Sequence, residues 1–358
     1  MKKLFYFAAA AVALAACAKN EVVPVNSGEN QEITFNVAPK TKADPQTFDT
    51  RNVFASWAYY LPKDKNWNAD WKEAVEYIGT KHAGSTISFK DNVWKDQTTS
   101  YYWPKKGSLT FFAYSLNSNK LSETDGECFF YCEKEAGNAE GSTKDQYGIT
   151  GFLNLDAHPN TDFLVADIAD DKTDNEDKYN FTGVPTLFRH RLSRVQFAVK
   201  KNADYANTKI TLNSITFNHL SCGMTYTQFL KDSEGHFSES IIPTTDYKSQ
   251  EYTNIDYEVA SLDFVTIPVA NEVRYIYIPQ NFKNVNTTAT INVTYTVTYK
   301  TGISETYTRT INVNEIFDSW EMGKKYTFNL IFSLKEITWA PAVQDWETIS
   351  NTTGKEVA

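Results

Sequence analysis

Residues 291–299 read Ile-Asn-Val-Thr-Tyr-Thr-Val-Thr-Tyr, so that apolar or aromatic side chains alternate with polar ones. Successive side chains of a β-strand point to opposite faces of the sheet, and this alternation therefore predicts a strand with one buried face. Similar alternating or apolar-aromatic stretches occur at 33–37, 52–60, 109–114, 162–165, 188–199, 210–217, 273–278, 311–313 and 328–334. Many short strands of this kind predict an all-β chain, built as a β-sandwich or a barrel.

The composition is that of a globular protein and suggests more than one domain. The chain has 358 residues, of which 41% are hydrophobic and 15% aromatic. At roughly 100–200 residues per domain, two domains are expected. The formal net charge is −9, whereas a nucleic-acid-binding protein needs a basic face. We therefore predict no nucleic-acid partner.

A change of phase in the apolar pattern places the domain boundary. Phe188, His190 and Leu192 occupy even positions, whereas Val195 and the apolar residues after it occupy odd ones. The buried face switches near Ser193, which predicts a bulge or a crossover at that point. We predict an N-terminal β-sandwich domain over 31–190, a C-terminal β-sandwich domain over 191–346 and a polar tail over 347–358.

The first 16 residues have the form of an export signal. A basic start, Met1-Lys2-Lys3, precedes an apolar, uncharged stretch over 4–16, which is shorter than the about 20 residues of a membrane-spanning helix. Leu14-Ala15-Ala16-Cys17 matches a bacterial lipobox, which predicts a signal peptide over 1–16, lipid including palmitate on Cys17 and a tether over 17–30. A plain secretory peptide with a chance cysteine is the alternative. The lipoprotein interpretation predicts a surface-exposed protein of the outer membrane.

Signals for catalysis, metal or cofactor binding are absent from the sequence. The histidines are scattered and lack the spacing of zinc ligands: His82, His158, His190, His219 and His236. His190 lies on an apolar strand face and is expected to be a hydrogen-bonded core residue. An acidic run over 167–177 lacks the register of a calcium loop. We predict no enzyme, no metal and no cofactor, although a dispersed pair of catalytic carboxylates leaves no sequence signal.

Tryptophan and cysteine leave two further questions to the structure. A sugar-stacking platform or ordinary core packing could explain the tryptophans in the first third of the chain: Trp57, Trp67, Trp71, Trp94 and Trp103. Cys128 and Cys132 would lie on one face of a strand, about 13 Å apart, which is too far for a disulfide. Together with Cys222 they are expected to be buried small apolar groups.

An ordered set of short motifs resembles the fimbrillin-like (Mfa-like, type V pilin) lipoproteins of Bacteroidetes. The resemblance covers nearly the whole chain and follows the lipobox. The motifs, in chain order, are Ile33-Thr34-Phe35-Asn36-Val37, Lys40-Thr41-Lys42-Ala43, Val53-Phe54-Ala55, Tyr102-Trp103-Pro104, Leu109-Thr110-Phe111-Phe112-Ala113-Tyr114, Thr161-Asp162-Phe163-Leu164-Val165-Ala166, Leu187-Phe188-Arg189-His190-Arg191-Leu192-Ser193-Arg194-Val195, Tyr277-Ile278-Pro279-Gln280, Trp320-Glu321-Met322-Gly323-Lys324-Lys325-Tyr326-Thr327 and Val343-Gln344-Asp345-Trp346.

The resemblance implies two transthyretin-like (Greek-key) β-sandwich domains and assembly by strand exchange. In such pilins a trypsin-like protease removes the first strand, and a strand of the next subunit fills the vacated groove. Carried over to this chain, the removable strand contains Ile33, Phe35 and Val37. The cut would follow Lys42, with Lys40 as the second choice, where many relatives have Arg-Ala. An Arg-specific protease would not cut there, so the chain could also stay uncut and lipid-anchored.

The donor candidate is the C-terminal segment with Ile337, Trp339, Val343 and Trp346, interrupted by Pro341. A proline suits an edge strand or a bend. The alternative is that this segment closes the sheet of its own domain.

These features predict a stalk or tip subunit of a cell-surface fimbria, with other fimbrial subunits and the outer membrane as partners. An uncleaved anchor lipoprotein is one alternative. A surface glycan-binding lipoprotein, in which an exposed Trp67 or Trp94 would contact host or bacterial glycans or proteins, is the other.

Overall fold

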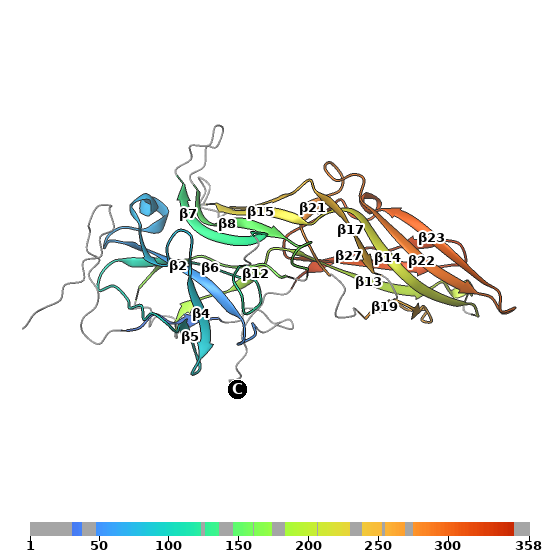
Figure 1. Cartoon of the computed structure of the whole chain (residues 1–358), viewed down its shortest axis with the longest axis horizontal. Helices are drawn as coiled ribbons and strands as arrows, with labels where there is room; N and C mark the ends of the chain where they lie inside the picture. The colour runs from blue at the N-terminus through green and yellow to red at the C-terminus, as the bar shows by residue number, and fades with distance from the viewer. Residues whose placement is uncertain are drawn as a thin grey trace, which may run out of the picture.

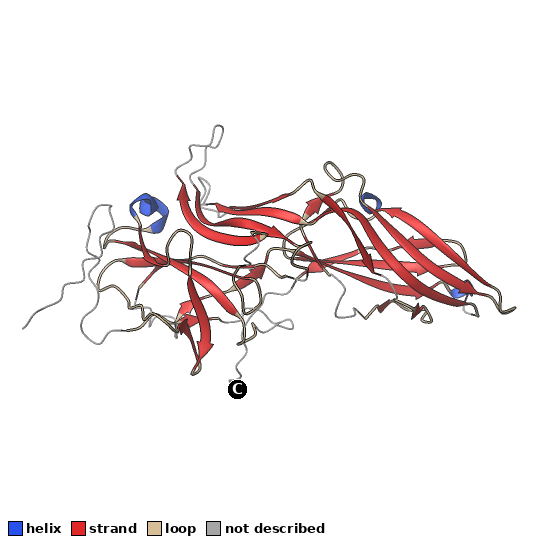
Figure 2. Cartoon of the chain, viewed as in Figure 1, coloured by secondary structure: helices blue, strands red, loops and turns tan. Residues whose placement is uncertain are grey.

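The protein is an elongated, almost entirely β structure (Figures 1 and 2). The computed structural model describes residues 31–37, 48–122, 126–135, 146–159, 161–173, 183–205, 207–229, 238–252, 255–268 and 275–346. Within these ranges no helix has the length and apolar character needed to span a membrane. The all-β prediction is confirmed.

Two sheets form the half of the molecule that contains most of the N-terminal strands. The larger sheet has the order β11 (Val184–Pro185), β1 (Phe35–Asn36), β5 (Val93–Asp96), β4 (Ser85–Lys90), β2 (Val53–Leu61), β6 (Ser108–Ser115), β9 (Leu164–Ala166) and β12 (Phe188–His190), with β10 (Ala169–Lys172) on β6 and β3 (Val75–Ile78) on β2. The smaller sheet has the order β16 (Ser238–Pro243), β15 (Gly223–Phe229), β8 (Gln146–Asn154) and β7 (Cys128–Glu135).

The larger sheet is buried on both faces at its centre, because it curls around a core of its own. Every residue of β6 is buried, and so is every residue of β2 after its first. On one face, Trp57 and Phe112 belong to a core shared with the smaller sheet, which we call the inter-sheet core. On the other face, Phe54 and Phe111 pack with Phe35 of β1 in a second cluster, which we call the β1 core.

A short helix covers one end of the inter-sheet core. The helix α1 (Trp67–Asp70) continues into the 3₁₀ turn η1 (Trp71–Glu73). Asn66 caps α1, because its side-chain oxygen accepts a hydrogen bond from the Ala69 backbone N–H at 3.1 Å. Trp67 is completely buried, so the helix brings an aromatic anchor to the core.

Two further sheets form the C-terminal half. The six-stranded sheet has the order β19 (Val265–Thr266), β13 (Ser193–Lys201), β25 (Lys324–Phe332) and β26 (Ile337–Trp339), with β20 (Ile276–Tyr277) on β13 and β27 (Ala342–Asp345) on β25. The five-stranded sheet has the order β17 (Tyr247–Tyr252), β14 (Lys209–Ser221), β22 (Thr290–Thr298) and β23 (Ser304–Asn312), with β18 (Tyr257–Glu258) on β14. A small ladder joins β21 (Gln280–Asn281) to β24 (Ser319–Trp320). The same half contains the 3₁₀ turns η3 (Ala203–Tyr205) and η4 (Val313–Glu315).

Alternating side chains fill the space between these two sheets. Tyr295 on β22 and Phe332 on β25, for example, meet edge to face with their ring centroids 5.2 Å apart. The burial pattern of β22 alternates without a break. The alternation that predicted this strand therefore reflects one face in the core of the C-terminal half and one face toward solvent.

The chain passes between the halves where the apolar phase switches. β12 ends at His190 and pairs with β9, whereas β13 begins at Ser193 and pairs with β25, so the predicted crossover is present. In addition, β15 follows residue 190 in sequence but pairs with β8. The division of the chain into two domains at residue 190 therefore stays a prediction, since the smaller N-terminal sheet takes strands from both sides of it.

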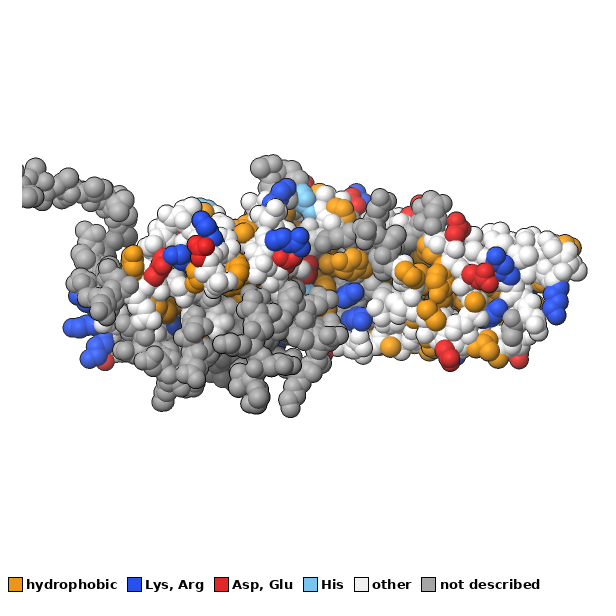
Figure 3. Space-filling view, turned by 90° about the horizontal axis from the view of Figure 1, so that it is seen from below, with side chains coloured by type: hydrophobic (Ala, Val, Ile, Leu, Met, Phe, Trp, Pro, Cys, Tyr) orange, Lys and Arg blue, Asp and Glu red, His pale blue; other side chains and the backbone are white. Residues whose placement is uncertain are grey.

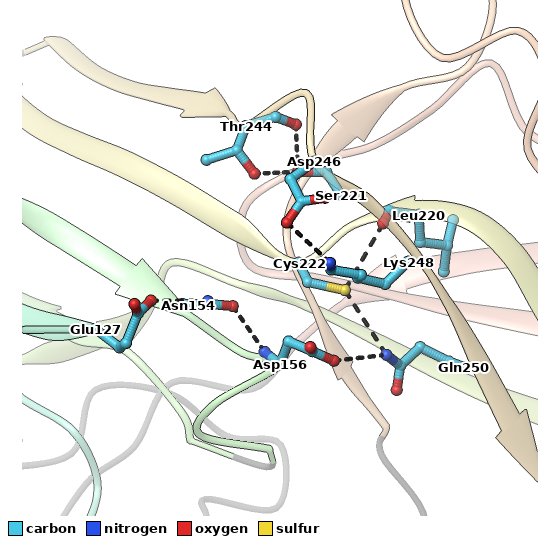
Figure 4. Close-up of polar contacts among 10 residues, drawn as sticks. All are labelled: Glu127, Asn154, Asp156, Leu220, Ser221, Cys222, Thr244, Asp246, Lys248 and Gln250. Carbon is cyan, nitrogen blue, oxygen red and sulfur yellow. Dashed lines mark hydrogen bonds and ion pairs between the residues drawn. The ribbon is translucent and has the colours of Figure 1, made fainter. Parts of the chain in front are cut away.

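Polar contacts join the end of β8 to β14 and β17 near this crossing (Figure 4). Gln250 donates its side-chain N–H to the Asp156 carboxylate at 3.4 Å and to the Cys222 sulfur at 3.7 Å. Cys222 is buried and, like Cys128 and Cys132, is not in a disulfide. The prediction that these three cysteines are buried small groups is confirmed.

The C-terminal half exposes apolar side chains on one face. Figure 3 views the molecule from the side on which β19 lies, and hydrophobic side chains gather over this half. Next to and within β19, Leu262, Phe264 and Val265 are 48%, 38% and 39% exposed. Exposed apolar groups that lie together are common on surfaces that contact other macromolecules.

Candidate functional site

The short strand β1 lies inside the larger N-terminal sheet, not at its edge. It runs parallel to β11, with Phe35 opposite Val184, and antiparallel to β5, with Phe35 opposite Trp94. Neighbouring backbone groups extend these contacts along the whole segment. Toward β11, Thr34 O accepts a hydrogen bond from Val184 N at 2.7 Å and Asn36 O accepts one from Thr186 N at 2.9 Å. Toward the segment that follows β5, Ile33 N donates to Tyr101 O at 2.8 Å and Gln31 O accepts from Trp103 N at 3.1 Å.

The side chains of the segment alternate as the sequence predicts. Ile33, Phe35 and Val37 are 3%, 4% and 3% exposed and belong to the β1 core. The Phe35 ring meets the ring of Phe54 edge to face, with centroids 5.4 Å apart, and that of Phe111 at 5.9 Å. β1 is thus inserted between two strands and closes an apolar trench opposite β2 and β6.

An ion pair at the start of the segment adds an electrostatic contact. The Lys95 ammonium on β5 lies 2.7 Å from the Glu32 carboxylate, and both side chains are partly buried. Burial raises the pKa of Glu32, but hydrogen bonds from Lys95 and Ser100 outweigh this effect and leave the pKa below its usual value. The carboxylate is therefore held in its charged form beside Lys95.

Gly183 lets β11 approach the backbone of β1 closely. Its φ is +131°, and an added Cβ would lie 2.8 Å from the Thr34 carbonyl oxygen and 3.0 Å from the Phe35 carbonyl carbon. Because these neighbours are backbone atoms of the docked strand, a side chain at this position would push β1 out of line with β11.

We expect Gly183→Ala to weaken the docking of β1 by about 1–3 kcal/mol, because it adds both backbone strain and the clash with Thr34. The measurement is amide hydrogen exchange of residues 33–36 in the uncut chain, which should become faster.

Gly302→Ala is the matched control, since Gly302 also has a positive φ of +82° but has open space around it. Equal exchange of β1 in the two variants would show that close packing of β11 on β1 does not hold the strand.

The chain on the C-terminal side of β1 returns to the same core. Phe48 is 1% exposed and stacks on Phe188 with ring centroids 5.1 Å apart. The predicted processing positions Lys40 and Lys42 fall between Val37 and Phe48, and they lie outside the described residues, as does Cys17 with its signal peptide and tether. A cut after Lys42 would separate β1 from Phe48 while leaving both on buried sites.

The C-terminal segment lies along the edge of the six-stranded sheet. β26 pairs with the end of β25, and β27 pairs with its beginning, both antiparallel. Ile337 is buried and Trp339 is partly buried, whereas all four side chains of β27 are exposed, Val343 by 53%. Most of β27 is therefore held by backbone pairing on one side only.

A single aromatic side chain fixes the far end of this segment. Trp346 is 6% exposed and stacks on the His190 ring, with centroids 3.7 Å apart and planes 8° from parallel. Its backbone N–H donates to Gly323 O at 2.7 Å. His190 is itself buried and lies 3.0 Å from Asp162 through Nδ1, so the prediction of a hydrogen-bonded core histidine is confirmed.

The other sequence candidates fall into the packing of the fold. Trp57, Trp67, Trp71, Trp94 and Trp103 are between 0% and 9% exposed. The core-packing interpretation of these tryptophans is confirmed, because their rings lie in the two N-terminal cores. The exposed Trp67 or Trp94 that the glycan-binding alternative requires is therefore contradicted. Among the residues that the structure describes, no cluster of three or more His, Cys, Asp or Glu side chains is arranged for a metal ion.

Two parts of the site have no clear sequence signal. β11 has only two residues and follows a stretch rich in acids, so nothing marks it as the parallel partner of β1. Lys95 lies far from Glu32 in the sequence, and its role depends on the pairing of β5 with β1. The glycine before Val184-Pro185 is the one local hint of a close backbone approach.

Comparison with solved structures gives matches along most of the chain at low identity. A proposed cell adhesion protein of Bacteroides uniformis is 14% identical, with a TM-score of 0.46 and coverage of 88% of this chain and 98% of that one. One of Bacteroides ovatus is 16% identical, with a TM-score of 0.43 and coverage of 90% and 99%. The truncated tip fimbrial protein Mfa3 of Porphyromonas gingivalis is 9% identical, with a TM-score of 0.29 and coverage of 88% and 100%. A search of curated proteins gives no match.

The sequence itself matches a family model. The model described as fimbrillin-like matches residues 41–346, which is most of the chain. The chain therefore belongs to the fimbrillin-like family.

Proposed function

We propose that this protein is a structural subunit of a cell-surface fimbria, exported as a lipoprotein and assembled by protease-triggered strand exchange. Membership of the fimbrillin-like family supports a fimbrial role and a structural one in preference to catalysis. Assembly by strand exchange is supported by the position of β1, a short buried strand inserted between β11 and β5.

Loss of β1 would leave a groove that needs an occupant. The backbone groups of β11 and β5 that face β1 would become unpaired, and unpaired strand edges recruit other strands. The trench vacated by Ile33, Phe35 and Val37 is apolar, and filling it stabilises the protein by about 1.5–3 kcal/mol for each buried side chain. An extended segment with apolar side chains at alternate positions would satisfy both needs.

The donor, we propose, is the C-terminal segment of another subunit. β13 and β25 start together at the crossing between the halves and run away from it in parallel. The nine residues of β25 span about 30 Å, so the turn that follows it, at 333–336, lies at the far end of the C-terminal half. Ile337 could move only about 17 Å from Phe332, and the groove of its own chain is out of reach.

This geometry favours a head-to-tail contact. A segment released from the far end of one molecule would enter the N-terminal half of the next, and such a contact does not close on itself. Repetition would give a fibre. We further propose that the two halves are transthyretin-like sandwich domains and that lipid on Cys17 holds the precursor at the outer membrane.

We expect limited trypsin digestion to remove the residues before Ala43 and to produce ladders that resist mild heating in SDS. The variant Lys40→Gln/Lys42→Gln should keep the N-terminal segment and stay monomeric, because neither side chain offers trypsin a basic group. N-terminal sequencing and gel electrophoresis measure the two outcomes.

The variant Lys40→Arg/Lys42→Arg is the control and should behave as the unmodified chain does, because trypsin accepts both basic residues. Ladders from the glutamine variant with β1 still attached would contradict assembly by strand loss.

An uncleaved anchor lipoprotein is the second candidate, and lysine at the processing positions favours it. If the protein is such an anchor, the form isolated from the cell surface keeps a lipid-blocked Cys17. If it is a stalk or tip subunit, its first residue is Ala43. The mass of the N-terminal peptide distinguishes the two.

A further inference from the structure

Two segments of this chain share almost the same four residues. Glu32–Phe35 reads Glu-Ile-Thr-Phe and ends in the first residue of β1, and Glu336–Trp339 reads Glu-Ile-Thr-Trp and consists of Glu336 followed by β26. The first lies in the groove between β11 and β5, whereas the second lies on the edge of the C-terminal half. The chain thus carries a second copy of the sequence that fills its own groove.

We infer that the groove takes the Glu336–Trp339 segment from a second copy of this chain, in the register of Glu32–Phe35. The inference rests on the proposed strand exchange and adds the identity of the partner and the alignment of the strand. Ile337 would take the place of Ile33, Trp339 that of Phe35 and Ala340 that of Asn36.

The backbone of the second segment offers the groups that the groove uses. The groove binds the first segment through the carbonyl oxygens of Gln31, Thr34 and Asn36 and through the N–H of Ile33. In the inferred register the corresponding groups belong to Lys335, Thr338, Ala340 and Ile337. Pro341, which has no N–H, takes the place of Val37, and none of these four bonds depends on that nitrogen.

The side chains match at both ends of the motif. Glu336 would meet Lys95, which now pairs with Glu32 at 2.7 Å. Trp339 would enter an aromatic environment made by Phe54 and Phe111, which now hold the Phe35 ring at 5.4 and 5.9 Å. The indole is larger than the phenyl ring that it replaces, so these rings have to adjust to admit it.

Cysteine cross-linking tests the register directly. Phe35 lies opposite Trp94 in an antiparallel pair, and continuing this register by one residue would bring Thr34 opposite Lys95. Residues opposite each other in such a pair have Cα atoms about 4.5–5.5 Å apart, within the range of a disulfide. Acceptor chains with Lys95→Cys are mixed with donor chains that carry Glu336→Cys, Thr338→Cys or Ala340→Cys, all with Cys17→Ser and after limited trypsin digestion.

We expect Thr338→Cys to give the major disulfide-linked dimer on a non-reducing gel, with the other two at least several-fold weaker. Thr34→Cys/Lys95→Cys in one uncut chain is the geometric control and should form the bond within the chain. A major dimer from Glu336→Cys or Ala340→Cys would overturn the register. Ladders from the unmodified chain without any of the three dimers would overturn the choice of donor while leaving strand exchange intact. Absence of ladders from the unmodified chain would instead contradict the proposed function.

Discussion

Replacing Phe35 with alanine is expected to weaken the docking of β1 by about 3–5 kcal/mol, the usual cost of removing a buried phenylalanine. The ring is 4% exposed and packs edge to face on Phe54 and Phe111, so its loss leaves a cavity at the centre of the β1 core. Since 1.4 kcal/mol is a factor of ten, amides of residues 33–36 should exchange roughly a hundred-fold to several thousand-fold faster in the uncut chain.

The control for this variant is Asn36→Ala on the opposite face of the same strand. The side chain of Asn36 is outside the core, and its backbone oxygen keeps the bond from Thr186 N, so exchange of β1 should change little. If Phe35→Ala left exchange at the level of this control, the strand would be held by its backbone pairing and not by the trench.

The sequence predicts the strands that have one solvent face better than those without one. β22 alternates without interruption, and this pattern alone is enough to predict it as a strand with one buried face. β2 and β6 are buried on both faces, so their apolar runs predict strands but not which core each side chain joins. The curl of the sheet that creates the β1 core depends on β1 and β11, which have two residues each in the ladder.

The candidate site is predictable where it is local and unpredictable where it depends on pairing. The alternation of Ile33, Phe35 and Val37 is visible in the sequence, and their burial follows it. The contacts of Gly183 and Lys95 with this segment come from strands far away in the chain. The same limit explains why the sequence leaves the choice between core packing and a sugar-stacking platform open for Trp67 and Trp94, because composition gives the number of aromatic side chains but not the face on which each lies.

Trp346→Ala is expected to release the C-terminal segment. The indole ring of Trp346 stacks on His190. It is the main buried side chain that holds the end of the C-terminal segment, because all four side chains of β27 are exposed. Loss of the indole ring should weaken the docking of the C-terminal segment by about 3–5 kcal/mol. Amides of residues 342–345 should then exchange roughly a hundred-fold to several thousand-fold faster, whereas those of β13, which is paired on both sides, should not. Hydrogen exchange with mass spectrometry measures both.

Val343→Ala is the matched control, since Val343 is 53% exposed on the same strand and its truncation should change exchange by less than a factor of about three. If the C-terminal segment is the donor, trypsin-cut Trp346→Ala protein should also assemble faster, because the open state that donates the strand is more populated. Faster exchange without faster assembly would mean that release of the segment does not limit strand exchange. Unchanged exchange would mean that pairing with β25, and not the Trp346 stack, keeps the segment on its own chain.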